Sequence, residues 1–185
     1  MMLRLAHMNP LKIALVSVTF FSLASCAHAP VAAGEARTAR APLESKSGSS
    51  VTGTAEFVQT GNDVVLTLTV AGATPGKHAA HVHVMPDCSD PEAKAAGDHW
   101  NPSHEDHGQF DVAPFHLGDI GNLDVGADGT GSLRLTTSRW SIGTGAENDL
   151  LKHSVVVHAS VDDLKTNPSG NSGGRQACGV IEQVK

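Results

Sequence analysis

The chain has 185 residues and a formal net charge of −6. This length allows one domain of about 150 residues with a sizeable core, together with an N-terminal extension. The acidic balance excludes the basic footprint that a nucleic-acid-binding protein needs, so no nucleic-acid partner is expected. The sequence has no tyrosine, two tryptophans and five phenylalanines, but 19 glycines. This composition favours a β-rich fold with many turns over a helix bundle.

The N-terminus has the features of an export signal. Residues 13–25 form an apolar run behind Lys12, too short to span a bilayer comfortably and ending in small residues. The run closes on Leu23-Ala24-Ser25-Cys26, which resembles the bacterial lipoprotein box, in which the cysteine is acylated. Ordinary cleavage after Ala27-His28-Ala29 is the alternative. We expect export to the periplasm or cell envelope, with lipidation at Cys26 favoured because that cysteine is otherwise unexplained.

The sequence therefore divides into a signal (1–26), an Ala-rich flexible tether (27–37) and a folded domain (38–185). Only Arg4 and Lys12 among the charged residues precede residue 27, so a chain processed there carries 11 − 19 = −8. A protein this acidic needs a local positive site in order to attract an anion.

Short segments of alternating polarity predict strands along the domain. A weak strand is expected within residues 38–50, where Pro42 would confine it to an edge or a bulge. Further strands are expected at 51–59, 63–71, 131–137, 154–160 and 177–184. Together with a histidine-bearing strand after Gly76, seven or eight strands and no convincing helix predict an all-β sandwich or barrel.

Histidines are concentrated between residues 78 and 119, which hold seven of the chain's eleven. His81 and His83 flank Val82, so the period of two places both imidazoles on one face of a strand. A segment rich in Pro, Gly and Asp follows, carries more histidines and closes on Asp119. A strand-borne histidine pair followed by such a loop predicts metal binding.

With one histidine from a later strand, the chain offers enough ligands for two metals. A nitrogen-only set suits copper, and three histidines with a carboxylate suit tetrahedral zinc. The candidates are His81, His83, His99, His107, His116, Asp119 and His158.

Six stretches spread along the domain carry a family resemblance. They are GKHAAHVH (76–83), HWNP (99–102), HG (107–108), HLGDIGN (116–122), VVHASVDDL (156–164) and GNSGGRQACGVI (170–181). With these stretches the chain closely resembles the copper–zinc superoxide dismutase family, and some of its features look bacterial. The resemblance implies an eight-stranded Greek-key β-sandwich or barrel with long metal-binding and electrostatic loops, and one copper and one zinc per subunit.

The resemblance also implies a role for each candidate ligand, with His99 bridging the two metals. The copper ligands would be His81, His83, His99 and His158. The zinc ligands would be His99, His107, His116 and Asp119.

By the same resemblance the protein converts superoxide to dioxygen and hydrogen peroxide, protecting the cell envelope. Copper suits this reaction because it can accept and return one electron, which zinc cannot do. Arg175 and His99 would be the catalytic residues, with Arg175 docking the superoxide anion. Asp162 would hydrogen-bond His81 and His107 and so orient both metal sites.

The cysteines and the remaining histidines receive roles in the same way. Three cysteines are an odd number for an exported protein. If Cys26 is lipidated, Cys88 and Cys178 remain, and the resemblance implies a disulfide between them. His78 is expected to have a structural hydrogen-bonding role, and His104 and His153 are expected at the surface.

Two features depart from the family pattern. Ala79 and Ala80 replace a glycine and an aromatic residue, which removes no ligand. The segment 159–174 is short, with Lys165 its only basic residue, so that guidance of superoxide is weaker or arranged differently.

Two other functions remain open at this point. A non-catalytic member of the same fold would bind or buffer copper, and a structural β-sandwich would carry its histidines at the surface. The sequence leaves open whether the protein is a monomer or a homodimer.

Overall fold

The computed structural model describes residues 36–185. The predicted signal, Cys26 and nearly all of the predicted tether lie outside the described residues. Among the residues described, no helix has the length and apolarity needed to cross a membrane.

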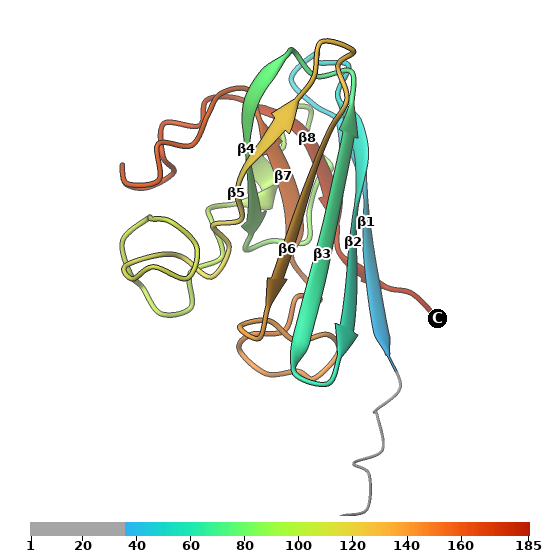
Figure 1. Ribbon diagram of the computed structural model, residues 1–185, viewed down its shortest axis with the longest axis vertical. Helices are drawn as coiled ribbons and strands as arrows, with labels where there is room; N and C mark the ends of the chain where they lie inside the picture. The colour runs from blue at the N-terminus through green and yellow to red at the C-terminus, as the bar shows by residue number, and fades with distance from the viewer. Residues whose placement is uncertain (1–35) are drawn as a thin grey trace, which may run out of the picture. The chain divides into compact units, whose positions relative to one another are not determined.

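The described chain forms a closed antiparallel barrel (Figure 1). Sheet order is β2-β3-β6-β5-β4-β7-β8-β1, and a further pairing of β1 with β2 closes the ring, while β9 adds to β1. The strands are β1 (Arg37–Ser45), β2 (Thr52–Thr60), β3 (Asp63–Ala71), β4 (Gly76–His83), β5 (Gly121–Val125), β6 (Gly131–Thr137), β7 (Ser154–His158), β8 (Arg175–Val180) and β9 (Glu182–Gln183).

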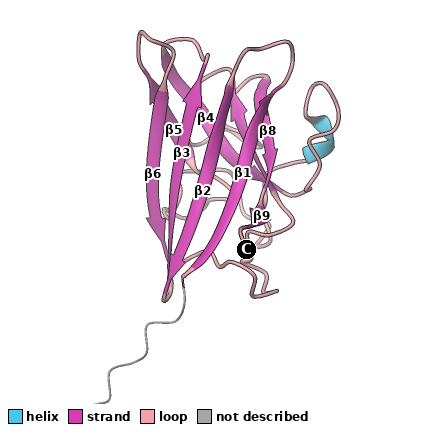
Figure 2. Cartoon of the chain, turned by 90° about the vertical axis from the view of Figure 1, so that its right-hand side faces the viewer, coloured by secondary structure: helices cyan, strands magenta, loops and turns pink. Residues whose placement is uncertain are grey.

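The connections between the strands are of the Greek-key type. β3 and β4 follow each other in sequence, but β6 and β5 lie between them in the sheet. The structure thus confirms the predicted all-β class and its eight-stranded barrel, with β9 as a two-residue addition. The described helical structure is limited to one 3₁₀ turn, η1 (Lys94–Ala96), drawn in cyan in Figure 2.

Alternating polarity places one face of each strand in the core. In β3 the side chains of Val64, Leu66, Leu68 and Val70 are buried, and the residues between them are more exposed. Each fully buried apolar side chain of this size stabilises the fold by about 1.5–3 kcal/mol. The barrel interior is therefore an apolar core, against which the metal-binding loops can be fixed.

Pro42 does not make β1 an edge strand. β1 pairs with β2 over Arg37–Leu43 on one side, and with both β8 and β9 on the other. The β8 ladder reaches Glu44, and the β9 ladder reaches Arg40, so Pro42 lies in the gap between them. A proline has no backbone N–H to donate. It is tolerated at this position because the strand pairing is interrupted there and no hydrogen bond from residue 42 is needed.

Two long segments connect strands on one side of the barrel: residues 84–120, between β4 and β5, and residues 159–174, between β7 and β8. The later part of the first segment (yellow-green) and the second segment (red-orange) lie on the left in Figure 1. The first returns to β4, since the Trp100 N–H donates to the Val82 carbonyl (2.9 Å) and the Val82 N–H donates to the Gly118 carbonyl (2.8 Å). These bonds place both halves of the long segment beside the His81-Val82-His83 stretch.

Aromatic packing fixes the same segment to the core. Buried Trp140 donates from Nε1 to the Leu117 carbonyl (2.9 Å), and its ring lies 5.2 Å from that of Phe110 and 6.1 Å from that of Phe57. Trp140 therefore joins the segment that carries His116 and Asp119 to the barrel interior.

Candidate metal centre

The structure brings all seven candidate ligands together in two buried groups that share one residue. Within each group the ligand atoms lie within 4.8 Å of one another. One group is His81, His83, His99 and His158, and the other is His99, His107, His116 and Asp119. His99 belongs to both.

The four-histidine group is oriented by backbone carbonyls. His83 Nδ1 lies 2.9 Å from the Gly97 oxygen, and His158 Nδ1 lies 3.3 Å from the Gly173 oxygen. A neutral imidazole has a single N–H, so Nδ1 is the donor in both rings and Nε2 carries a lone pair. The two Nε2 atoms lie 3.4 Å apart. Two facing lone pairs at this distance repel unless they share a cation.

Two further nitrogens of this group lack hydrogen-bond partners. His81 Nδ1 and His99 Nε2 are buried without an acceptor or donor. Buried polar atoms in proteins are nearly always satisfied, so such orphans require an explanation. A metal bound by four nitrogens explains both orphans and the facing lone pairs, and this donor set suits copper.

Burial keeps these imidazoles neutral. It lowers the pKa of His81, lowers those of His83 and His158 well below the ordinary value, and lowers that of His99 to about 4. Neighbouring histidines add to the effect at each position, while Asp162 opposes it at His81 and Asp119 at His99. The neutral imidazole is the form that binds a metal, so all four rings are prepared for a ligand role.

The second group converges on Asp119. Its Oδ1 lies 2.9 Å from His99 Nδ1, 3.0 Å from His107 Nδ1 and 3.2 Å from His116 Nδ1. Its Oδ2 accepts backbone N–H bonds from Gly108 (3.1 Å) and His116 (2.8 Å), which fix the carboxylate. Despite its closeness to Asp119, His107 Nδ1 makes no aligned hydrogen bond. Three nitrogens and one oxygen fit tetrahedral zinc.

The surroundings of Asp119 strongly favour the ionised form of its carboxyl group. Burial alone would raise its pKa, but the close contacts of His107, His116 and His99 outweigh burial and hold that pKa far below its usual range. Asp119 is therefore ionised, as a carboxylate ligand of zinc must be.

Asp162 links the two groups by a second route. Its Oδ2 lies 2.8 Å from His81 Nε2 and its Oδ1 lies 2.9 Å from His107 Nε2. Each ring therefore uses Nε2 for Asp162 and leaves Nδ1 toward its own group. The hydrogen bonds of His107 and His81 overcome burial and keep the Asp162 pKa below its usual range. The charges of Asp119 and Asp162 likewise overcome burial and raise the pKa of His107 to about 9, so metal binding at this ring must release a proton.

Two residues that the sequence analysis did not single out hold Asp162 in place. The Asn122 side chain donates to the Asp162 carbonyl (2.9 Å) and accepts from the Asp162 N–H (2.8 Å). Gly170 has φ +63°, and a Cβ there would lie 1.8 Å from Asp162 Oδ1. Any larger residue would push the carboxylate away from His81 and His107. Asn122 and Gly170 could have been found from the sequence, since they lie in the HLGDIGN and GNSGGRQACGVI stretches that carry the family resemblance.

Arg175, at the start of β8, lies beside the four-histidine group. Its Nη1 donates to the Ala93 carbonyl (2.6 Å) and its Nη2 to the Gly97 carbonyl (2.7 Å). The Gly97 carbonyl also accepts from His83, so one backbone oxygen ties the arginine to a histidine of the group. Burial lowers the Arg175 pKa, but guanidinium pKa values are so high that the group stays charged. Sequence patterns do not specify such carbonyl contacts, so these contacts of Arg175 were not predicted.

The predicted Cys88–Cys178 disulfide is present, with 5.7 Å between the two Cα atoms. It joins the beginning of the 84–120 segment to β8, three residues after Arg175. Ala93 and Ala96 pack with Cys178 in a small buried cluster. The bond thereby holds the segment whose carbonyls position the arginine.

The remaining histidines have separate positions. His78 is buried, with Nδ1 2.8 Å from the His158 carbonyl, as expected of a structural residue. His104 is exposed, as predicted. His153 lies at the surface but is partly covered, because its ring stacks on Trp100 at 4.3 Å and its Nδ1 contacts the Val84 carbonyl at 2.9 Å. Its flanking polar residues gave no sign of this packing.

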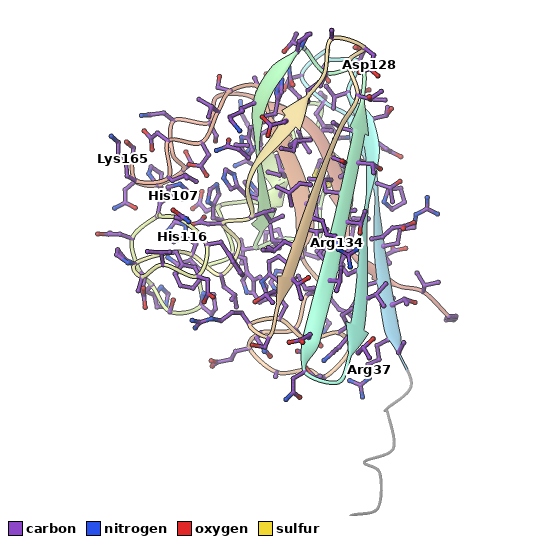
Figure 3. The ribbon with its side chains drawn as sticks, viewed as in Figure 1. Arg37, His107, His116, Asp128, Arg134 and Lys165 are labelled. Atoms are coloured by element: carbon purple, nitrogen blue, oxygen red, sulfur yellow. A yellow bond between two sulfur atoms is a disulfide. The ribbon has the colours of Figure 1, made fainter. Side chains whose placement is uncertain are left out.

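Figure 3 shows His107 and His116 together on the loop side of the barrel, with Lys165 on the neighbouring loop. Comparison with known proteins agrees with this architecture: residues 51–181 match the family model described as copper/zinc superoxide dismutase. The chain belongs to this family. It is also 39% identical over 160 residues to a protein of Deinococcus radiodurans named superoxide dismutase [Cu-Zn], and the match covers 80% of this chain and 85% of the relative. As a copper–zinc superoxide dismutase family member, the protein has copper and zinc as its cofactors.

Proposed function

We propose that this protein disproportionates superoxide to dioxygen and hydrogen peroxide at a copper held by His81, His83, His99 and His158. In this proposal His99, His107, His116 and Asp119 hold zinc. The observation that carries the assignment is His99, whose Nδ1 lies among the Asp119 group while its buried Nε2 is an orphan on the four-histidine side. One imidazole thus serves two ligand sets.

When bound, copper supplies a centre for one-electron transfer, and zinc supplies a fixed positive charge that eases deprotonation of its imidazole ligand. The chain's own contribution is to hold His99 between the two sites. Because Nδ1 is committed to the Asp119 group, Nε2 is the atom of His99 at which a proton can be held beside the substrate. Asp162 fixes His81 and His107, one ring from each ligand group, and so holds the two groups in a fixed relation.

Arg175 is proposed to dock the substrate anion. The chain is acidic overall, with a formal charge of −6, so the substrate needs a local positive site. A guanidinium held by two carbonyls is a fixed charge with remaining N–H donors. Its charge reaches the four-histidine group, where it contributes to lowering the pKa of His83 and His158, after the larger effects of burial and neighbouring histidines.

The proposal predicts one copper and one zinc per chain and rapid superoxide consumption. The measurement is metal content by mass spectrometry, with superoxide decay followed by stopped flow. His99→Ala should lose activity and bind both metals more weakly, because it removes one ligand from each group. The matched control His104→Ala, at an exposed histidine, should keep activity and both metals. Full occupancy by both metals without superoxide consumption would instead favour the second candidate, a copper-binding or copper-buffering protein.

We also propose that the protein is exported, anchored by a lipid on Cys26, and protects the cell envelope from superoxide. The apolar run at 13–25 and the Leu23-Ala24-Ser25-Cys26 sequence support this. Cys26→Ser should move the protein from the membrane fraction to the soluble fraction on cell fractionation. Identical distribution of the two forms would rule out acylation.

A further inference from the structure

Ser172 is a buried hydroxyl beside the four-histidine group. It lies in the 159–174 segment and is 1% exposed. Its Oγ lies 3.2 Å from His158 Nδ1. Two backbone bonds fix its position: its carbonyl accepts from the Ser160 N–H (2.9 Å), and its own N–H donates to the Ser169 carbonyl (3.2 Å). The backbone of Ser172 is therefore held in place, and its buried side chain lies beside the His158 ring.

The direction of this hydrogen bond follows from the other nitrogen of the ring. His158 Nε2 faces His83 Nε2 at 3.4 Å and points into the ligand group. The proton of the neutral ring therefore belongs on Nδ1, which makes Ser172 Oγ an acceptor. The same N–H also faces the Gly173 carbonyl at 3.3 Å, so two acceptors share one donor.

The contrast with His83 shows why the second acceptor matters. His83 Nδ1 has a single carbonyl at 2.9 Å, close to the optimum for an N–H···O bond. The 3.3 Å contact of His158 to Gly173 is beyond the usual range, and would by itself orient the ring weakly. Ser172 adds a second acceptor at 3.2 Å, the upper end of that range, so the His158 ring is oriented by two contacts together where His83 has one short bond.

We propose that Ser172 is a positioning residue for copper: its hydroxyl accepts a hydrogen bond from His158 Nδ1, which fixes the ring plane and makes Nε2 a stronger donor. An acceptor on the far nitrogen of a metal-bound imidazole increases the basicity of the ligating nitrogen. A more basic donor stabilises Cu(II) more than Cu(I). This inference rests on the proposed assignment of copper to His158.

The test compares Ser172→Ala with the control Ser160→Ala, which removes an exposed hydroxyl from the same segment. Outer partners of metal ligands typically contribute about 10- to 100-fold to affinity. We expect Ser172→Ala to weaken Cu(II) binding by about tenfold, at the lower end of that range because Gly173 remains as an acceptor. The readout is competition with a chelator of known Cu(II) affinity, with the thermal midpoint of the metal-free protein measured alongside.

Two further measurements separate positioning from simple space filling. The Cu(II) electron paramagnetic resonance spectrum should change in Ser172→Ala, whereas Zn(II) affinity should stay within about twofold, because the Asp119 group is untouched. If the tenfold loss falls on Cu(II) alone, the copper potential rises by about 59 mV.

An unchanged Cu(II) affinity and spectrum in Ser172→Ala would overturn the proposal. Failure of the wild-type protein to bind copper at all would instead contradict the proposed function, so the two failures are distinguishable. Ser160→Ala should match the wild type in every measurement. A loss in both variants would indicate a general loosening of the 159–174 segment and would also overturn the role of Ser172.

Discussion

Arg175→Glu should lower kcat/KM for superoxide by at least tenfold. Guidance of superoxide by positive charge is already well known for superoxide dismutases, and local fields of this kind generally raise association rates by about 10- to 1000-fold. The guanidinium is held over the Ala93 and Gly97 carbonyls beside the four-histidine group. A carboxylate there would repel the anion at the point where it must dock.

The matched control is Lys165→Glu, which makes the same change of charge at an exposed position. It should reduce the rate by less than about twofold, since exposed charges act over roughly one Debye length of about 8 Å at physiological salt. The wild-type rate should also fall as salt rises, and Arg175→Glu should lose this dependence. Equal rates for Arg175→Glu and Lys165→Glu would contradict a special role for Arg175.

Removing the Cys88–Cys178 bond should destabilise the metal-free protein by about 4–5 kcal/mol according to the chain-entropy model, and often less in practice. The bond spans a sequence separation of 90 residues, so its loss greatly enlarges the unfolded ensemble. The measurement is urea unfolding of Cys88→Ala/Cys178→Ala. Alanine is preferred to serine because Cys178 is buried in an apolar cluster.

The same protein reduced with a thiol reagent is the control, because it loses the bond without any change of side-chain volume. Reduced wild type and the double variant should agree to within about 1 kcal/mol, and both should unfold well before the oxidised protein. A difference from the oxidised form below about 1 kcal/mol would contradict stabilisation through restriction of the unfolded chain.

Alternating polarity in the sequence predicted the positions of individual strands. β2 and β3 were expected within one residue of their observed bounds, because their polarity alternates cleanly over nine residues each. The closure of the barrel depends on the β1–β2 pairing together with β1–β8, and a period of two does not identify strand partners. The tolerance of Pro42 within β1 is a consequence of that closure.

For the site, the residue types together with the family resemblance predicted which side chains gather, but not what holds them. The seven candidate ligands form the two observed groups, and Cys88 pairs with Cys178 as expected. The carbonyls of Ala93 and Gly97, the bonds of Asn122 to the Asp162 backbone and the contact of Ser172 with His158 were not predicted. Backbone acceptors are present at every residue, so only the fold shows which of them face an imidazole or a guanidinium.

Anomalous diffraction from crystals of the metal-loaded protein, recorded at the copper and zinc edges, tests the shared role of His99. We predict a copper peak bounded by His81, His83 and His158, and a separate zinc peak bounded by His107, His116 and Asp119. His99 should lie between the two peaks, with Nε2 toward copper and Nδ1 toward zinc. A single metal peak would contradict the bridged centre. Two peaks that do not lie beside Nε2 and Nδ1 of His99, one at each nitrogen, would contradict it as well.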